Sequence, residues 1–382
     1  MSKWVSVWGN AMSIVDQTPA GYAKDITLRY PILIPLDGKG LRLTFDNFTG
    51  LETIKITKIT VAKSTGPSSI DLTTLEKVTF NGMDELELGK GEHKTCDPIV
   101  MNINKGECLT VSLYLKDYTS MRCGIQLFGP TSKSYYSLGN QTISEELCSK
   151  DTREITWMYF LSQIDLLTSD ENKSVICFGD SITSLAWPDY LQLFFMKDMK
   201  NNTSIVRKAV SGSRILRQYD CLTYAAYGIQ GLTRFPHETK VKGAESIIIL
   251  HGINDIIHPV GIEINEFRPW SDLPTVQELI DGLCEYIKHA KSLGLKVYLG
   301  TLTPIKGWRT YNEMRNTLRE EINTWIRSTD LVDGMIDFDL ILRDENDPAE
   351  LNPIYDSGDH LHPNDLGMIQ MAQEAKKVLN ND

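Results

Sequence analysis

The chain has 382 residues, of which 41% are hydrophobic and 23% are charged, a composition typical of globular proteins. Its formal net charge of −11 argues against a nucleic acid or an anionic membrane surface as the main partner, because each of these requires a basic face on the protein. A chain of this length exceeds one ordinary compact domain, so we expect two domains.

The first half of the chain reads as a series of short strands. Apolar and polar residues alternate, with turn signals between the runs, at residues 41–45, 54–56, 59–61 and 109–115. No helical period persists in this half. We therefore expect residues 1–170 to form an all-β, jelly-roll-like sandwich that serves as an accessory domain, followed by a polar linker near residues 168–173.

The second half, residues 171–382, changes period. Short apolar runs suited to buried strands occur at residues 175–178, 205–206, 247–250 and 297–299. Helical patterns separate them, and the pairs Thr275/Glu278 and Thr310/Glu313 have the spacing of capping boxes that open two of these helices. The alternation of strands and helices predicts an α/β domain with a doubly wound parallel sheet.

Small or polar residues follow the predicted strands and recur before the last helix. They are Gly179-Asp-Ser181, Ser211-Gly-Ser213, His251–Asp255 and Asp359–Pro363. Ligands of a doubly wound sheet bind at the carboxyl ends of its strands, where such residues collect. Taken singly, each has an ordinary explanation, since a serine after a strand is most often a helix N-cap and a glycine in a loop most often meets a backbone need.

Together these residues match the needs of acyl transfer. Ser181 can serve as the nucleophile, His362 as the base that takes its proton, and Asp359 as the group that orients that base. The backbone N–H groups of Ser181 and Gly212 and the side-chain amide of Asn254 can bind the developing oxyanion. The spacing of three residues lets one loop carry both Asp359 and His362.

The start of the chain and its cysteines indicate in which cellular compartment the protein works. Residues 1–9 contain no continuous apolar run like that of a secretory signal, and no apolar segment reaches membrane-spanning length. The seven cysteines are scattered and include no Cys-x-x-Cys pair, and no His/Cys group has zinc-site spacing. We expect reduced thiols in a cytoplasmic protein without a bound metal. The sequence leaves the oligomeric state open.

The four segments resemble the blocks of the GDSL, or SGNH, hydrolase family. The blocks appear here in order, as residues 179–183, 211–212, 252–255 and 359–364. The resemblance covers residues 173–382 and implies a flavodoxin-like hydrolase domain. It places the family's nucleophile, oxyanion donors and Asp-x-x-His pair on Ser181, Gly212, Asn254, Asp359 and His362.

Further segments look like a two-domain bacterial branch of this family, in which a β-sandwich precedes the hydrolase domain. They are residues 42–47, 301–304, 323–327 and 358–365. One segment departs from that branch: residues 207–213 read Arg-Lys-Ala-Val-Ser-Gly-Ser, where the branch carries an Asn-x-Gly-Ile-Ser-Gly-Asn-like block. Gly212 is kept, so the departure puts only the neighbouring substrate contacts in doubt.

Two residues of the last loop compete with the chosen pair. His360 could act as the base in place of His362, and Asp356 could orient it in place of Asp359. The Asp-x-x-His spacing favours Asp359 and His362.

Other residues near the site have structural explanations. We expect Asp180 to hold the turn before the serine, and Cys177 to lie in the core. Arg214 could contact substrate, but a salt bridge or a solvated charge is the commoner role. Tyr135 and Tyr136 could line a sugar site, although packing is again the commoner role.

The leading hypothesis is a serine esterase that needs no metal or organic cofactor and acts on a small-molecule or oligosaccharide ester. The resemblance to the two-domain branch implies removal of acetyl groups from carbohydrates. The family also contains lipases, lysophospholipases and thioesterases, which remain alternatives. A non-catalytic carbohydrate-binding protein is a further alternative. A nucleotide-binding domain is disfavoured, because the sequence contains neither a Gly-x-Gly-x-x-Gly motif after a strand nor a Walker motif.

Overall fold

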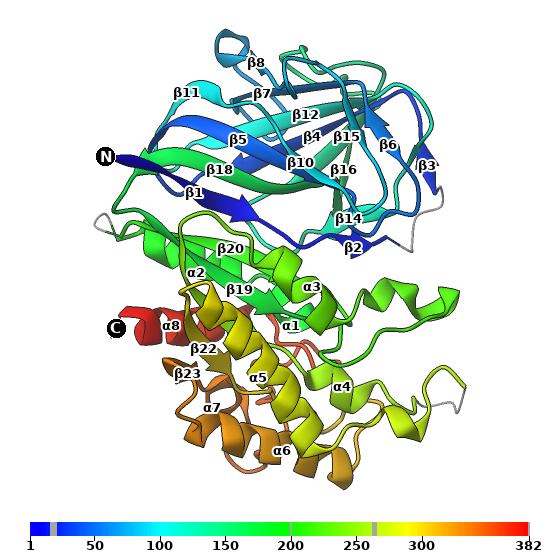
Figure 1. Ribbon diagram of the computed structural model, residues 1–382, viewed down its shortest axis with the longest axis vertical. Coiled ribbons are helices and arrows are strands. Elements are labelled where there is room, and N and C mark those ends of the chain that lie inside the picture. Colours follow the sequence, from blue (N-terminus) through cyan, green and yellow to red (C-terminus); the bar gives the residue numbers. More distant parts are fainter. Residues whose placement is uncertain (16–20, 199–200, 262–265, 381–382) are drawn as a thin grey trace. The chain divides into compact units, whose positions relative to one another are not determined.

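The computed structural model describes residues 1–15, 21–198, 201–261 and 266–380. The chain forms two compact units (Figure 1). One consists of Met1–Ser174 with Met199–Val206, and the other of Val175–Asp198 with Arg207–Asp382. The predicted division into domains at residue 170 stays a prediction, because a domain is defined by its ability to fold alone.

In the part of the chain that the structure describes, the first unit is built from strands and a short 3₁₀ helix at Leu72–Thr74. Its strands are β1 (Ser2–Gly9), β2 (Ser13–Ile14), β3 (Tyr22–Ala23), β4 (Ile26–Leu33), β5 (Gly38–Asp46), β6 (Ile54–Ile56), β7 (Lys58–Lys63), β8 (Glu76–Lys77), β9 (Leu86–Leu88), β10 (His93–Thr95), β11 (Ile99–Ile103), β12 (Cys108–Leu115), β13 (Thr119–Ser120), β14 (Cys123–Gln126), β15 (Ser134–Leu138), β16 (Arg153–Ile155), β17 (Trp157–Tyr159) and β18 (Leu161–Ser169).

Two antiparallel sheets dominate this unit (Figure 1). One has the strand order β1-β18-β5-β10, with β11 also paired to β5, and the other the order β16-β15-β4-β12-β7-β8. Alternate residues of their strands point into one apolar core, among them Leu41, Leu43 and Phe45 of β5 and Leu109, Val111 and Leu113 of β12. The period-two pattern of the sequence is therefore the pattern of burial.

The second unit alternates strands and helices. Its strands are β19 (Lys173–Gly179) from Val175 on, β20 (Thr203–Ala209) from Arg207 on, β21 (Ala244–Leu250), β22 (Lys296–Gly300) and β23 (Gly334–Ile336). Its helices are α1 (Ser181–Ser184), α2 (Trp187–Met196), α3 (Gly231–Glu238), α4 (Ile253–Ile257), α5 (Val276–Ser292), α6 (Glu313–Ser328), α7 (Phe338–Leu342) and α8 (Asp365–Asn380), with short 3₁₀ helices at Leu222–Tyr227 and Trp270–Asp272.

The sheet of this unit positions the candidate site. Its strand order is β20-β19-β21-β22-β23, and β21–β22 and β22–β23 pair in parallel as predicted. The order reverses direction at β19, so the loops after β19, β20 and β21 diverge around one point, where ligands of such sheets bind. Helices pack in two groups, α2 and α7 with α8, and α5 with α3 and α6 (Figure 1).

Helix starts agree with the sequence in one case and differ in another. Thr275 and Glu278 form the predicted capping box at the start of α5. The predicted box at Thr310 is wrong: α6 begins at Glu313, and Asn312 is its N-cap. The Thr310 hydroxyl instead donates to the backbone oxygen of Ile257 at 2.8 Å, because a contact with a distant segment outweighs the local pattern.

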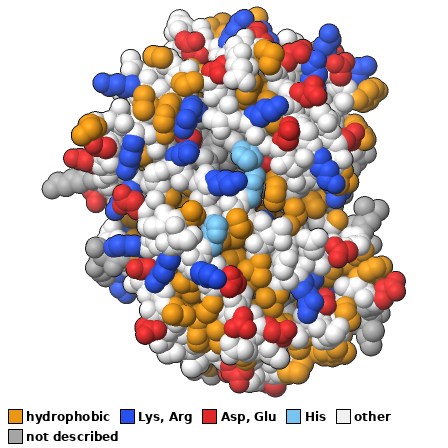
Figure 2. Space-filling view, in the orientation of Figure 1, with side chains coloured by type: hydrophobic (Ala, Val, Ile, Leu, Met, Phe, Trp, Pro, Cys, Tyr) orange, Lys and Arg blue, Asp and Glu red, His pale blue; other side chains and the backbone are white. Residues whose placement is uncertain are grey.

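Charge and membrane features can also be read from the structure. Acidic and basic side chains are interspersed over the face seen in Figure 2. Within the described ranges, none of the helices combines the length and the apolar character needed to cross a membrane. All seven cysteines lie in the described part of the chain, and none is joined to another by a disulfide.

Candidate active site

Ser181 follows the end of β19 but does not cap the next helix. Asp180 is the N-cap of α1, and its carboxylate accepts a hydrogen bond from the backbone N–H of Ile182 at 3.1 Å. The prediction that Asp180 holds this turn is confirmed. A Cβ at Gly179 would lie 2.2 Å from the backbone oxygen of Leu250, so only glycine fits there. The hydroxyl of Ser181, the first residue of α1, is left available for another role.

Three of the predicted residues form one chain of hydrogen bonds. The Oγ atom of Ser181 lies 2.8 Å from Nε2 of His362, and Nδ1 of His362 lies 2.6 Å from Oδ2 of Asp359. An ionised carboxylate can only accept hydrogen bonds, so the proton of the neutral imidazole resides on Nδ1. The lone pair of Nε2 therefore faces the hydroxyl of Ser181, as a general base requires.

The loop around Asp359 keeps its carboxyl group ionised. Partial burial opposes the charge, but hydrogen bonds from the side chain and the backbone of His362 outweigh it and hold the pKa of Asp359 well below its usual range. The backbone N–H of Leu361 also donates to this carboxylate, at 3.0 Å. Asp359 can thus orient His362 and stabilise it when it becomes charged.

The two competing residues pair with each other. Nδ1 of His360 lies 2.7 Å from Oδ2 of Asp356, and the His360 side chain is 54% exposed. Asp356 also accepts from the backbone N–H groups of Gly358 and His360, which shapes the loop. The structure therefore places His362, and not His360, against Ser181.

Gly212 and Asn254, the two other predicted oxyanion donors, are linked by Ser213, which follows Gly212 in the chain and binds Asn254. Gly212 has a φ of +79°, and a Cβ there would lie 2.2 Å from the ring of Tyr227, so both the backbone conformation and the space require glycine. Asn254, in α4, is 2% exposed, and its Nδ2 donates to the backbone oxygen of Ser213 at 3.1 Å. This bond uses one of the two amide N–H groups. Their joint action on an oxyanion stays a prediction.

Arg234 supports the loops that carry Ser181 and Gly212, and it is not among the residues predicted from the sequence. Its guanidinium is fully buried and donates to the backbone oxygen of Gly179 at 2.6 Å and to Oγ of Ser213 at 3.1 Å. It also lies 4.1 Å from the ring centroid of Phe178. Arg234 thus links the turn before Ser181 to the loop that carries Gly212. No local signal marks it, because its partners lie far away in sequence.

The buried side chain of His251 also holds the loop that carries Gly212 and Ser213. Nε2 of His251 lies 3.0 Å from Oγ of Ser213, and its Nδ1 lies 3.1 Å from the hydroxyl of Tyr286. Burial, and then the charge of Arg234, lower the pKa of His251 well below its ordinary value. His251 is therefore neutral at physiological pH and holds the loop as an uncharged hydrogen-bonding group.

Two buried carboxyl groups near the site have raised pKa values. Burial raises the pKa of Asp180 to about 7, although the N–H of Ile182 and the charges of His362 and Arg234 oppose it. Burial likewise raises the pKa of Asp255 to about 6, against hydrogen bonds from two backbone N–H groups of the loop after β20. Both side chains serve to fix the backbone of these loops.

Other predicted features have clear outcomes. Cys177 is fully buried in β19, as predicted. Arg214 forms a salt bridge of 3.1 Å with Asp272, which agrees with the structural alternative given for it. Among the described residues, no three His, Cys, Asp or Glu side chains gather as a metal site would require.

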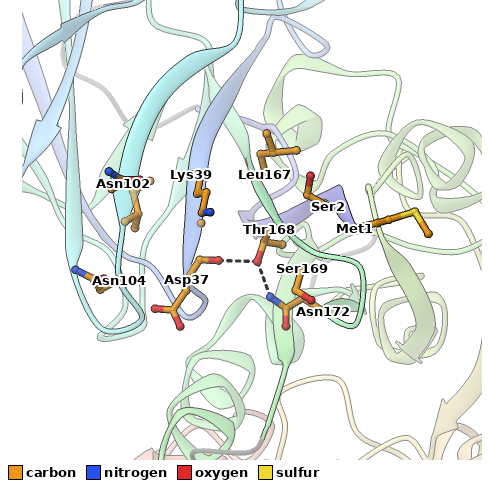
Figure 3. A pocket seen from close by; sticks show the side chains of 12 residues that line it. Met1, Ser2, Asp37, Lys39, Asn102, Asn104, Leu167, Thr168, Ser169 and Asn172 are labelled. Carbon is orange, nitrogen blue, oxygen red and sulfur yellow. Dashed lines mark hydrogen bonds between the residues drawn. The ribbon is translucent and has the colours of Figure 1, made fainter.

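The first unit has cavities of its own. One, of about 660 Å³, is lined by polar groups that include Asp37, Thr168 and Asn172, joined by the hydrogen bonds drawn in Figure 3. Another, also about 660 Å³, has Tyr135 in its lining, while Tyr136 packs against the core. The suggestion that Tyr135 and Tyr136 both line one sugar site is therefore not supported for Tyr136.

The chain is distantly similar to solved structures of other proteins. A GDSL-like lipase from Bacteroides thetaiotaomicron is 19% identical over 56% of this chain and 90% of its own, with a TM-score of 0.40. A member of the lipolytic G-D-S-L family from Veillonella parvula is 20% identical over 55% and 100%, with a TM-score of 0.38. A catalytic mutant of the acetylxylan esterase Axe2 from Geobacillus stearothermophilus is 16% identical over 54% and 93%, with a TM-score of 0.41.

No curated protein matches the chain. The family described as GDSL-like Lipase/Acylhydrolase matches residues 175–375, which is more than half of the chain and includes Ser181, Gly212, Asn254, Asp359 and His362. That span begins in β19, directly before the serine turn, and ends in α8, beyond the loop of the Asp–His pair. The chain therefore belongs to the GDSL-like lipase/acylhydrolase family.

Proposed function

We propose that the protein is a serine esterase that hydrolyses short acyl esters, above all acetyl esters, on carbohydrates. The observation that carries the proposal is the continuous hydrogen-bonded chain from Ser181 through His362 to Asp359. Membership of an acylhydrolase family supports the reaction class.

In the first half-reaction, Oγ of Ser181 bonds to the carbonyl carbon of the ester while Nε2 of His362 takes the hydroxyl proton. The tetrahedral intermediate then collapses, and His362 gives this proton to the departing alcohol. A water molecule reverses the sequence on the acyl-enzyme and releases the acid. Asp359 stays ionised throughout and stabilises the imidazolium.

The carbonyl oxygen becomes negatively charged in both half-reactions. We assign its stabilisation to the backbone N–H groups of Ser181 and Gly212 and to the side-chain amide of Asn254. Asn254 suits the role because its amide is buried and held in place by Ser213. A neutral donor binds the oxyanion without competing for the proton that His362 carries. No step requires a metal or an organic cofactor.

The carbohydrate substrate and the domain roles rest on the sequence. Residues 301–304 and 358–365 resemble the two-domain branch, which implies an acetyl ester of a sugar or an oligosaccharide. We propose residues 171–382 as a doubly wound, flavodoxin-like hydrolase domain and residues 1–170 as a jelly-roll-like accessory domain. We further propose a cytoplasmic location, which suits imported acetylated oligosaccharides.

The test measures acetate release from acetylated xylo- and manno-oligosaccharides by the wild type and by Ser181→Ala, with a nitrophenyl octanoate assay alongside. We expect acetate release that depends on Ser181. Turnover of the octanoyl ester alone would replace the carbohydrate esterase with a lipase or thioesterase. Sugar binding without turnover of any ester would indicate a non-catalytic binding protein. Matching circular dichroism spectra would establish that Ser181→Ala is folded.

A further inference from the structure

Aromatic and basic side chains gather beside the candidate active site. We call them the arginine–tyrosine cluster, which consists of Arg214, Tyr219, Tyr227, His258, Arg268 and Arg309. Three of its rings touch one another: the centroids of Tyr219 and Tyr227 are 5.5 Å apart, those of Tyr227 and His258 4.4 Å, and those of Tyr219 and His258 6.2 Å. The Arg214 guanidinium covers the Tyr219 ring at 4.3 Å.

The cluster borders the reacting groups on two sides. The ring of Tyr227 lies directly against Gly212, where even a methyl group would be excluded. On the other side, Trp308 packs edge-on to His362 with ring centroids 6.2 Å apart, and the guanidinium of Arg309 covers Trp308 at 4.5 Å. These contacts place Tyr227 beside the predicted oxyanion glycine, and Arg309 beside the ring that packs on His362.

Among the described residues, the guanidinium groups of the cluster outnumber the carboxylates that pair with them. Arg214 is paired with Asp272. Arg268 is 9% exposed, and its Nε donates to the backbone oxygen of His258 at 2.6 Å. Neither Arg268 nor Arg309 forms an ion pair with a carboxylate in the described part of the chain. A guanidinium group as buried as that of Arg268 usually has a carboxylate partner, whereas Arg309 is exposed and needs none.

Arg315, in α6, is a further guanidinium group that has no carboxylate partner among the described residues. Its guanidinium donates to the backbone oxygens of Ile256, Pro259 and Val260, and so fixes the segment that holds His258. Burial, and then the charge of Arg268, lower the pKa of Arg315, in keeping with guanidinium groups of the same sign lying close together.

Several buried polar atoms of the cluster have no hydrogen-bond partner within the described ranges: the hydroxyl of Tyr219, Nδ1 of His258 and Nε of Arg214. Tyr219 is 8% exposed, His258 5% and Arg214 2%. Buried polar groups are normally paired, so such a group points to a missing ligand or water. All of these atoms can donate, which calls for a ligand rich in acceptor oxygens.

His258 can donate without becoming charged. Burial, and then the charges of Arg268, Arg214, Arg309 and Arg315, lower its pKa well below the ordinary value. A neutral imidazole beside guanidinium groups can direct one N–H towards an anion, as the hydroxyl of Tyr219 can.

We propose that the arginine–tyrosine cluster is an anion subsite, which makes the preferred substrate an acyl ester whose alcohol part also carries a carboxylate or a phosphate. The proposal deepens the esterase function and rests on it for the reaction. Guanidinium groups bind carboxylates and phosphates through paired N–H donors.

The test uses one sugar with three groups at its sixth carbon. The substrates are mono-acetyl esters, acetylated at the same hydroxyl, of methyl glucuronide, methyl glucoside and methyl glucoside 6-phosphate. We expect kcat/KM for one of the two anionic esters to exceed that for the neutral ester by about tenfold, since a hydrogen bond to a charged group contributes roughly that factor or more. The two anionic substrates distinguish a carboxylate from a phosphate.

Tyr219→Phe and Arg309→Gln test the residues. The first removes only a hydroxyl, and the second changes an exposed side chain, so neither should unfold the protein. Each should lower kcat/KM for the anionic ester by several-fold and leave that for the neutral ester within about twofold. Lys288→Gln, which removes an exposed charge on α5, is the matched control and should change neither value.

The other possible outcomes of these assays either support or overturn the anion subsite. Ser181-dependent hydrolysis with equal rates on all three sugars would overturn the anion subsite and leave the esterase intact. Without Ser181-dependent hydrolysis of any ester, the proposed function fails, and calorimetry with glucuronate and inorganic phosphate decides the subsite. Binding that Arg309→Gln weakens would then support it, whereas absent or unchanged binding would overturn it.

Discussion

His362 makes two hydrogen bonds to Asp359 from within one short loop. Its Nδ1 lies 2.6 Å from Oδ2, and its backbone N–H donates to Oδ1 at 2.8 Å. One carboxylate therefore sets both the orientation of the ring and the path of the backbone that carries it. The spacing of three residues makes this double contact possible.

We predict that Asp359→Asn lowers kcat by roughly 10³–10⁴-fold with little change in KM, because an asparagine amide can turn a donor towards Nδ1 and favour the wrong tautomer. Steady-state kinetics on an acetyl ester measure the effect. Asp356→Asn, which alters the neighbouring His360 pair, is the control and should retain most of the activity. Equal losses in the two variants would contradict the assignment.

Asn254→Ala should lower kcat by about 10²–10³-fold, the usual effect of losing one oxyanion donor. The variant also loses the bond to the backbone of Ser213, so we expect a lower melting temperature. Circular dichroism at the assay temperature shows whether the variant is folded, so that a lower kcat is not a loss of folded protein. A near-normal kcat in Asn254→Ala would remove this residue from the oxyanion site.

Gly212→Ala should destabilise the protein much more than Gly294→Ala. Both glycines have similar positive φ angles, +79° and +77°, so both changes incur a left-handed strain of about 1–2 kcal/mol. Only at Gly212 does the new methyl group collide with a side chain, the Tyr227 ring, whereas at Gly294 it meets open space. Urea unfolding of the two variants measures the difference, and similar losses would show that the contact with Tyr227 relaxes easily.

The buried carboxyl group of Asp180 should make stability depend on pH. Its pKa is raised to about 7 in the folded state, above the value of about 4 in an unfolded chain. Between these values the unfolded chain loses the proton while the folded protein keeps it, so this group reduces stability as the pH rises from about 4 to 7.

Asp180→Asn should flatten that dependence. Asparagine can also cap α1, so the substitution keeps the hydrogen bond to Ile182 while removing the titration. Urea midpoints at pH 5 and pH 8 measure the effect: the wild type should lose more stability between them than the variant. Parallel curves would show that Asp180 does not hold its proton in the folded protein.

Local patterns in the sequence were sufficient to predict the elements that form through contacts between residues close together in the chain. The apolar run at 175–178 lies in β19, Thr275 and Glu278 open α5, and Asp359 reaches His362 across one loop. Each depends on interactions within a few residues, which sequence periodicity and spacing record.

Tertiary structure decided whatever depends on segments that are distant in sequence. It placed His362 rather than His360 against Ser181, and it used Thr310 for a long-range bond while Asn312 took over the cap. It also buried Arg234 beneath the site and brought Tyr219 and His258 together. The sequence alone therefore marked Ser181, His362 and Asp359 as the candidate reacting groups. The residues that support them and the charged cluster beside them arose only from packing, because no short-range pattern records which distant side chains will meet.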